Sequence, residues 1–265
     1  EEEPADTPAS VPLDNPVGHV RFEHVDFGYR PEVPILRDIS FDSPAGSSTA
    51  LVGPTGAGKT TIVNLLTRFY DVTGGSVRID GRDIREYSMD SLRRCFGIVL
   101  QDTYLFSGTI RENIRYGKPE ATDSEIREAA VLAGADTFIR RLPKGYDTVL
   151  SENGGNLSQG QRQLLAIARV ILSKPSILIL DEATSSIDTR TELQIQDALL
   201  QVMKGRTTFI IAHRLNTIRE ADRIMVIDQG QIAEQGSHDE LMARKGAYYR
   251  MFMNQFGHLE SAAGG

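Results

Sequence analysis

Short apolar segments recur along the chain and alternate with longer amphipathic ones. Four to eight apolar residues bounded by turn residues are typical of buried strands. The predicted strands are 20–29, 47–52, 77–79, 96–100, 177–180, 207–212 and 223–227. In the first of them the two-residue apolar spacing changes between Phe22 and Val25, which predicts an irregular strand.

Helical patterns lie between many of these strands. Residues 61–68 follow a glycine-rich loop, and residues 108–173 carry several helix signals, including a capping box at 122–125 before an apolar face. Strands separated by helices of crossover length predict an α/β fold with a mostly parallel sheet. The middle third predicts a helical insertion.

The start of the chain has the composition of a flexible segment. Residues 1–16 hold four prolines and only Val11 and Leu13 as large apolar side chains, which predicts a disordered linker. A cut from a longer polypeptide and a natural disordered tail both explain this segment. We expect the folded domain at 17–257 and a flexible tail at 258–265.

Composition and charge exclude several classes of protein. The 265 residues are 40% hydrophobic and 25% charged, an ordinary globular balance. A net charge of -7 argues against nucleic-acid binding, which usually needs a basic surface. The single cysteine, Cys95, cannot form an internal disulfide and suits a reducing compartment. No segment predicts a membrane span or a secretory signal, so we expect a cytosolic domain.

The segment GPTGAGKT, from Gly53 to Thr60, matches the P-loop pattern between a strand and a helix. Its backbone N–H groups and the helix N-terminus are expected to surround phosphates, with Lys59 on the outer phosphates and Thr60 on magnesium. The predicted nucleotide-binding residues here are Gly53, Pro54, Thr55, Gly56, Ala57, Gly58, Lys59, Thr60 and Thr61.

Two acids, Asp181 and Glu182, follow the apolar strand 177–180. Their carboxylates are expected at the carboxyl edge of the sheet, where the P-loop also opens. Asp181 is then placed to hold magnesium, and Glu182 to accept a proton from attacking water. The alternative is an acid pair that caps the next helix.

The segment 157–161, LSQGQ, resembles the signature motif of ABC ATPases, and the resemblance covers nearly all of the chain after residue 16. In that family the motif binds the γ-phosphate of a nucleotide held by the opposite subunit of a head-to-tail dimer. Ser158 also suits the N-cap of an apolar helix, and a plain helix start is the alternative. The implied nucleotide contacts are Ser158, Gln159, Gly160 and Gln161.

Further motifs follow in the order of the family. Gln101 corresponds to the Q-loop residue, 185–188 to the D-loop ending in Asp188, His213 to the switch histidine, and Tyr29 to the aromatic that stacks on adenine. Each is weak alone; Tyr29 also fits a core residue at a strand end. The resemblance implies that Glu182, His213, Gln101 and Lys59 are catalytic. It implies that Thr60, Gln101 and Asp181 hold Mg²⁺, and that Tyr29, Gln101 and Asp188 join the ATP site.

Two features resemble those of the exporter branch of the family: the stretch 109–114, and Glu152 shortly before the signature motif. This implies an α/β P-loop NTPase core with an antiparallel β subdomain and a helical subdomain at about 102–172. It also implies ATP hydrolysis that powers an attached transmembrane domain, contacted through coupling helices, at the cytoplasmic face of a cell membrane. The resemblance implies a second nucleotide-binding domain as partner. Gln159 replaces the first glycine of the family's usual pair, which leaves an identical and a related partner chain as alternatives.

Two other functions compete with this interpretation. One is a soluble ABC ATPase acting on nucleic acid or the ribosome, which the net acidity disfavours. The other is a P-loop kinase, for which the signature motif would have no role.

Overall fold

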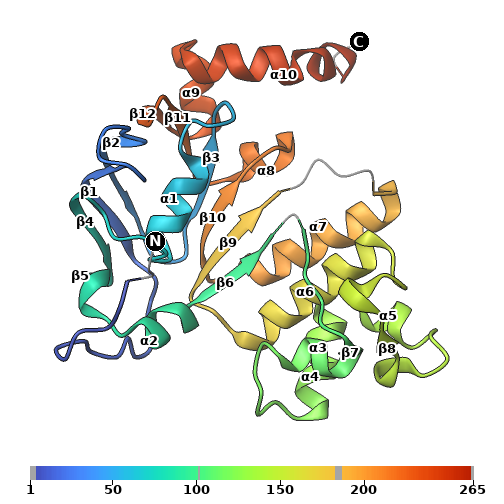
Figure 1. The fold of residues 1–265 in the computed structure, drawn as a ribbon. Coiled ribbons are helices and arrows are strands. Elements are labelled where there is room, and N and C mark those ends of the chain that lie inside the picture. Colours follow the sequence, from blue (N-terminus) through green and yellow to red (C-terminus); the bar gives the residue numbers. More distant parts are fainter. Residues whose placement is uncertain (1–3, 101, 183–186, 264–265) are drawn as a thin grey trace. The chain divides into compact units, whose positions relative to one another are not determined.

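The computed structural model describes residues 4–100, 102–182 and 187–263, with side chains described to residue 256. The chain divides into two compact units (Figure 1). The first unit comprises residues 1–96, 179–182 and 207–265, and the second comprises 97–178 and 183–206.

The first unit holds two sheets and the helices near them. Its early elements are β1 (Val20–Phe27), β2 (Leu36–Ser43), β3 (Ser48–Val52), α1 (Lys59–Leu66), β4 (Gly74–Ile79), β5 (Arg82–Asp83), η1 (Ile84–Glu86) and α2 (Met89–Arg94). Its later elements are β10 (Thr207–Ile211), α8 (Leu215–Glu220), β11 (Arg223–Asp228), β12 (Gln231–Gly236), α9 (His238–Arg244) and α10 (Ala247–Ala263). The division of the units passes through β6 (Phe96–Val99) and β9 (Ile177–Asp181).

The main sheet has the strand order β12-β11-β3-β10-β9-β6. β3 pairs in parallel with both β10 and β11, while β12 pairs antiparallel with β11. All five residues of β10 and four of the five in β9 are buried, which explains the apolar runs 209–211 and 177–180 within them. The predicted mostly parallel α/β core is confirmed.

The smaller sheet, in the order β2-β1-β4-β5, is the predicted antiparallel part. Its irregularity is confirmed, because the register with β2 shifts between Phe22 and Val25. His24 lies at that shift with a φ of 46°, a conformation that few residues other than glycine adopt. Phe22 stacks on Phe41 of β2 with ring centroids 4.5 Å apart, which closes the sheet over its core.

The second unit is mainly helical. Its elements are β7 (Gly108–Thr109), α3 (Ile110–Arg115), α4 (Asp123–Leu132), α5 (Asp136–Ile139), η2 (Gly145–Asp147), β8 (Val149–Leu150), η3 (Glu152–Gly154), α6 (Gln159–Ser173) and α7 (Thr189–Met203). The predicted capping box is present, since Thr122 Oγ1 accepts from the Glu125 N–H at 3.2 Å. Helix α6 buries nine residues among its neighbours α3, α4 and α7.

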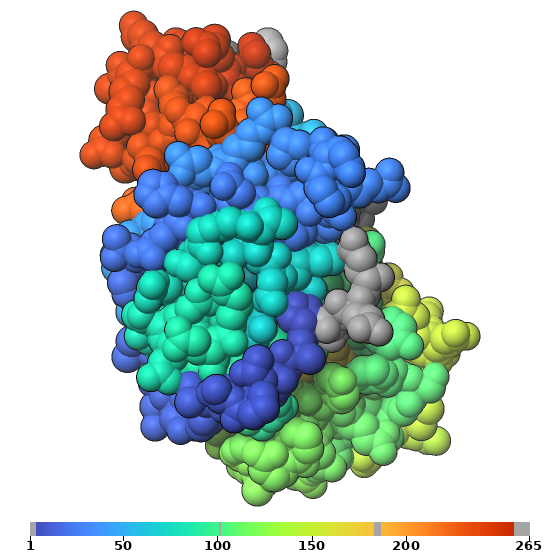
Figure 2. All heavy atoms as spheres, turned by 60° about the vertical axis from the view of Figure 1, so that its left-hand side comes forward, coloured from blue at the N-terminus to red at the C-terminus, as the bar shows by residue number. Residues whose placement is uncertain are grey.

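The segment before β1 contacts the first unit. Val11 forms a parallel bridge with Tyr87, and Asp6 accepts a hydrogen bond from the Met89 N–H at 2.7 Å. In Figure 2 this dark-blue segment lies beside the teal region of α2. The predicted limits of the linker, the folded domain and the tail stay predictions. Among the described residues, no helix combines the length and the apolarity that a bilayer span needs.

Candidate functional site

The P-loop joins β3 to α1 in a backbone path that needs glycine. Gly53, Gly56 and Gly58 have φ values of 147°, 79° and 114°. A Cβ on Gly53 would also lie 2.1 Å from the carbonyl oxygen of Ile227, so no larger residue fits. Helix α1 begins at Lys59 without a side-chain cap, which leaves its N-terminus suited to an anion.

The side chain of Lys59 is held over the P-loop by carbonyl groups of the loop backbone. Its ammonium donates to the carbonyl oxygens of Gly53 and, at 3.2 Å, Pro54. Burial lowers the pKa of Lys59 below its ordinary value, while the carboxylate of Asp181 acts in the opposite direction. Lys59 and Asp181 therefore interact electrostatically, as expected of residues serving one phosphate site.

Glu182 lies directly after β9 and only 6% of it is exposed. Its Oε2 accepts from the N–H groups of His213 and Arg214, both at 3.2 Å, and its Oε1 accepts from the Thr217 hydroxyl at 2.5 Å. The Glu182 N–H donates to Ile211 at the end of β10. A buried carboxylate is thus satisfied and fixed at the carboxyl edge of the sheet.

The alternative role of these acids as a helix cap does not fit the structure. The N-cap of α7 is Asp188, whose Oδ1 accepts from the Thr191 N–H at 3.0 Å. Those hydrogen bonds lower the pKa of Asp188. Asp181 and Glu182 therefore have no capping role at α7.

Tyr29 lies two residues after β1 and is 37% exposed, so it is not an enclosed core residue. Its ring packs edge-on against Phe27 and Tyr70, with centroids 4.9 and 5.1 Å away. Its hydroxyl lies 3.3 Å from Oγ1 of Thr61 in α1. An accessible aromatic ring is thus tied to the helix that begins at the P-loop.

The signature segment lies in the second unit and begins α6. Ser158 is the N-cap, and its Oγ accepts from the Gln161 N–H at 3.2 Å while Gln161 Oε1 accepts from the Ser158 N–H at 3.1 Å. Gln159 is exposed, whereas Gly160 is buried, and a Cβ there would lie 2.2 Å from Cγ2 of Thr191. Packing against α7 therefore requires the glycine at 160.

The structure brings together Tyr29, Thr61, the P-loop, Asp181, Glu182 and His213 within the first unit, with His213 half-buried after β10. The predicted Gln101, Ser185 and Ser186 lie outside the described residues. The sequence analysis missed Thr217 and Tyr70. The position of Thr217, four residues after His213, was the available signal for it.

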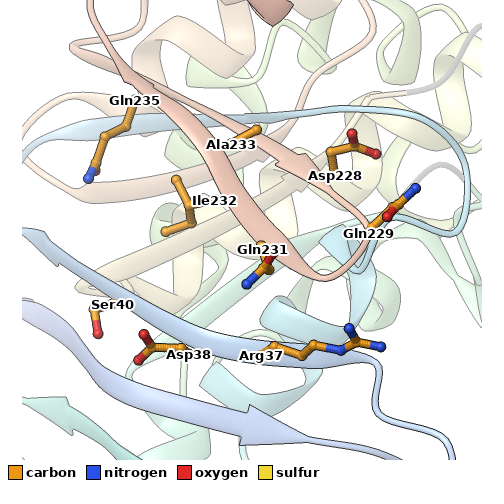
Figure 3. A pocket seen from close by; sticks show the side chains of 9 residues that line it. All are labelled: Arg37, Asp38, Ser40, Asp228, Gln229, Gln231, Ile232, Ala233 and Gln235. Atoms are coloured by element: carbon orange, nitrogen blue, oxygen red, sulfur yellow. The ribbon is translucent and has the colours of Figure 1, made fainter.

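A separate hollow lies between the edge strands β2 and β12 (Figure 3). The figure shows side chains of Arg37 and Asp38 from β2 on one side and of Gln231 and Gln235 from β12 on the other. None of its nine lining residues belongs to the predicted nucleotide site.

Comparisons with known proteins relate the chain to one family. The sequence profile of the ABC transporter family matches residues 36–185. The chain is 56% identical over 251 residues to the fatty acid ABC transporter ATP-binding/permease protein of Mycobacterium bovis. That match covers 94% of this chain and 40% of the relative. It is 53% identical over 237 residues to the ATP-dependent lipid A-core flippase of Syntrophus aciditrophicus. That match covers 89% of this chain and 39% of the flippase.

Among solved structures, a bacterial Atm1-family ABC exporter with ATP bound superposes with a TM-score of 0.89 at 48% identity. The match covers 96% of this chain and 45% of that one. The chain thus spans about 40% of the length of the curated relatives that it matches.

Proposed function

The chain belongs to the ABC transporter family, of which it is an ATP-binding and ATP-hydrolysing domain, and we propose that its hydrolysis powers transport of a substrate across a membrane by an attached exporter-type transmembrane domain. The observation that carries the catalytic part is Glu182, a buried carboxylate that directly follows Asp181, whose charge acts on the P-loop lysine. The proposed role in transport is supported by two relatives, one named a permease and the other a flippase.

In the proposed mechanism the chain positions ATP and one water molecule. The N–H groups of the P-loop and Lys59 bind the phosphates, and Tyr29 stacks on the base. Glu182 orients the attacking water and takes its proton, while His213 faces the outer phosphate. Catalysis of this kind consists mainly of positioning and charge stabilisation.

Magnesium fits the residues present. A hydroxyl from Thr60 and a carboxylate from Asp181 are oxygen donors of the type that Mg²⁺ prefers, and the charge of Asp181 already acts on Lys59. Protein sites for Mg²⁺ in ATPases use one or two such groups together with substrate phosphates. When bound, the ion would neutralise charge on the phosphoryl group during transfer. Gln101 is proposed as a third contact from the family resemblance.

We place the second half of each ATP site on another molecule. The start of α6 presents the exposed Ser158 and Gln159, and the capping box fixes the Ser158 hydroxyl. With Gly160, Gln161 and the D-loop Asp188 they are proposed to close on ATP held by the partner. The partner is a second nucleotide-binding domain, identical or related.

Two assays test the proposed function. ATPase activity of the domain is expected without any phosphate acceptor and unchanged by DNA or RNA. Its specific activity is expected to rise with protein concentration, because each site needs a partner. Stimulation by nucleic acid would support the soluble ABC ATPase instead. Constant specific activity down to nanomolar protein would contradict the composite site.

The membrane location is tested with the longer polypeptide. The relatives carry ATP-binding and permease parts in one protein, so we propose that Glu152 and residues 109–114 contact coupling helices of a transmembrane domain at the cytoplasmic face. Six hydrophobic spans upstream of Glu1 are expected in the gene that encodes this chain. Their absence there, and in any neighbouring gene, would contradict the proposal.

A further inference from the structure

We propose that Thr217 is a positioning residue for ATP hydrolysis: its hydroxyl aims Oε1 of Glu182, and Oε1 is the oxygen that receives the proton of the attacking water. This inference rests on the proposed role of Glu182 as the general base. It adds a residue that no motif considered above contains, and it separates the functions of the two carboxylate oxygens.

The hydrogen bonds of Glu182 are unequal at its two oxygens. Oε2 accepts from two backbone N–H groups, those of His213 and Arg214, each at 3.2 Å. Oε1 accepts from one side chain, the hydroxyl of Thr217, at 2.5 Å. An ionised carboxylate offers about four acceptor positions, two on each oxygen. Among the residues that the structure describes, donors therefore occupy both positions on Oε2 and one on Oε1, which leaves the other position on Oε1 for water.

The arrangement is fixed by the fold around it. Glu182 is 6% exposed, so an unsatisfied carboxylate there would carry a large desolvation cost. Its own N–H is held by Ile211, and Ile218, next to Thr217 in α8, is 2% exposed. Glu182 is thus anchored by its own burial, and Thr217 by the helix that the buried Ile218 packs into place. Within the described part of the chain, the position left on Oε1 therefore has a defined direction.

Thr217 differs from the other two donors in one respect that allows a test. Backbone N–H groups are present whatever the side chain, so substitution of His213 or Arg214 retains them. The Thr217 hydroxyl is lost in Thr217→Val, which keeps the branched shape, and is retained in Thr217→Ser. The pair of variants separates the hydroxyl from the packing of the side chain.

The experiment is steady-state ATPase kinetics of the wild type and both variants, with melting temperature and ATP affinity measured in parallel. Thr217→Val is expected to lower kcat between about 10- and 100-fold with little change in KM, since a misaimed catalytic group costs up to about 10² in rate. Thr217→Ser is expected to stay within about threefold of wild type, because it retains the donor. If Thr217→Val does not fold, Thr217→Ala replaces it, with the same loss expected because it also lacks the hydroxyl.

A combination with Glu182→Gln distinguishes this inference from the proposed function. If Thr217 acts only through Glu182, the double variant Glu182→Gln/Thr217→Val has the same residual rate as Glu182→Gln alone. A further loss in the double variant, a normal kcat in Thr217→Val, or failure of Thr217→Ser to retain activity would overturn the inference. Normal turnover in Glu182→Gln would instead overturn the role of Glu182 itself.

Discussion

The hydroxyl of Tyr29 lies 3.3 Å from Oγ1 of Thr61, so the chain just after β1 is joined to the first turn of α1. The adenine-stacking role proposed for Tyr29 needs its ring to stand at a fixed distance from the P-loop. This contact, together with the edge-on packing of Tyr70, supplies that constraint.

Tyr29→Ala is therefore expected to weaken ATP binding by roughly 1 to 3 kcal/mol, the scale of one base stacked on an aromatic ring. The rate at saturating ATP is expected to be unchanged. Tyr29→Phe is the matched control, because it keeps the ring and loses only the contact with Thr61. If calorimetry gives the same ATP affinity for wild type and Tyr29→Ala, Tyr29 does not stack on adenine and has a structural role only.

Lys59→Ala is expected to abolish tight ATP binding, because it removes the side-chain cation that faces the outer phosphates. Burial lowers the pKa of Lys59 below 10.5, so in the free protein its ammonium loses its proton earlier than an exposed lysine as the pH rises. The contribution of Lys59 to affinity is thus expected to fall on the alkaline side, at a lower pH than the contribution of an exposed lysine would. Isothermal calorimetry across that range is the measurement, with exposed Lys204→Ala as the control. An affinity for Lys59→Ala equal to that of wild type would exclude this role.

Gln159 provides a test of the partner. It is exposed at the first residue of α6, so glycine at this position is not required by the fold. In family members built from two related chains, one site is intact and the other altered, and we expect Gln159→Gly to raise the ATPase rate of the self-paired domain. Mixing with a partner that has two glycines is expected to raise it further. Equal rates for wild type and Gln159→Gly would favour a homodimer.

The acid stability of the helical unit depends on Glu125. Lys118 and the Thr122 N–H hydrogen-bond to this carboxylate and lower its pKa to about 2 from 4.5. A depressed carboxyl pKa contributes stability above pH 4.5 that is lost as the pH falls toward about 2. Glu125→Gln is expected to flatten this part of the pH–stability curve, whereas Glu128→Gln on the same helix is expected to leave it unchanged. Parallel curves for wild type and Glu125→Gln, followed by circular dichroism, would contradict this linkage.

The sequence predicts the buried strands of the main sheet well, because β9 and β10 contain the apolar runs 177–180 and 209–211. It does not predict β2 or β12. The alternation in β2 is interrupted before Ile39, and β12 is mostly polar, with exposed and half-buried positions in turn. Those strands are stabilised by pairing with β1 and β11, a tertiary effect that local spacing does not reveal.

The nucleotide site is predictable for a different reason. Its residues are close in sequence to the ends of strands, and the carboxyl ends of parallel strands meet at one edge. The contact between Thr217 and Glu182 cannot be predicted in this way, because Thr217 lies within α8 and not at the end of a strand. The contact depends on which side of that helix faces Glu182. That orientation emerges only from the packing of α8.

The ATPase rate of Glu182→Gln, measured together with its ATP affinity, decides whether Glu182 is the general base. Glutamine keeps the size of the side chain but cannot act as a general base at neutral pH. The account predicts normal ATP binding and hydrolysis slowed by about 10² to 10⁴-fold, with Glu220→Gln, an exposed control at the end of α8, hydrolysing at the wild-type rate. Turnover in Glu182→Gln close to that of wild type would contradict the account.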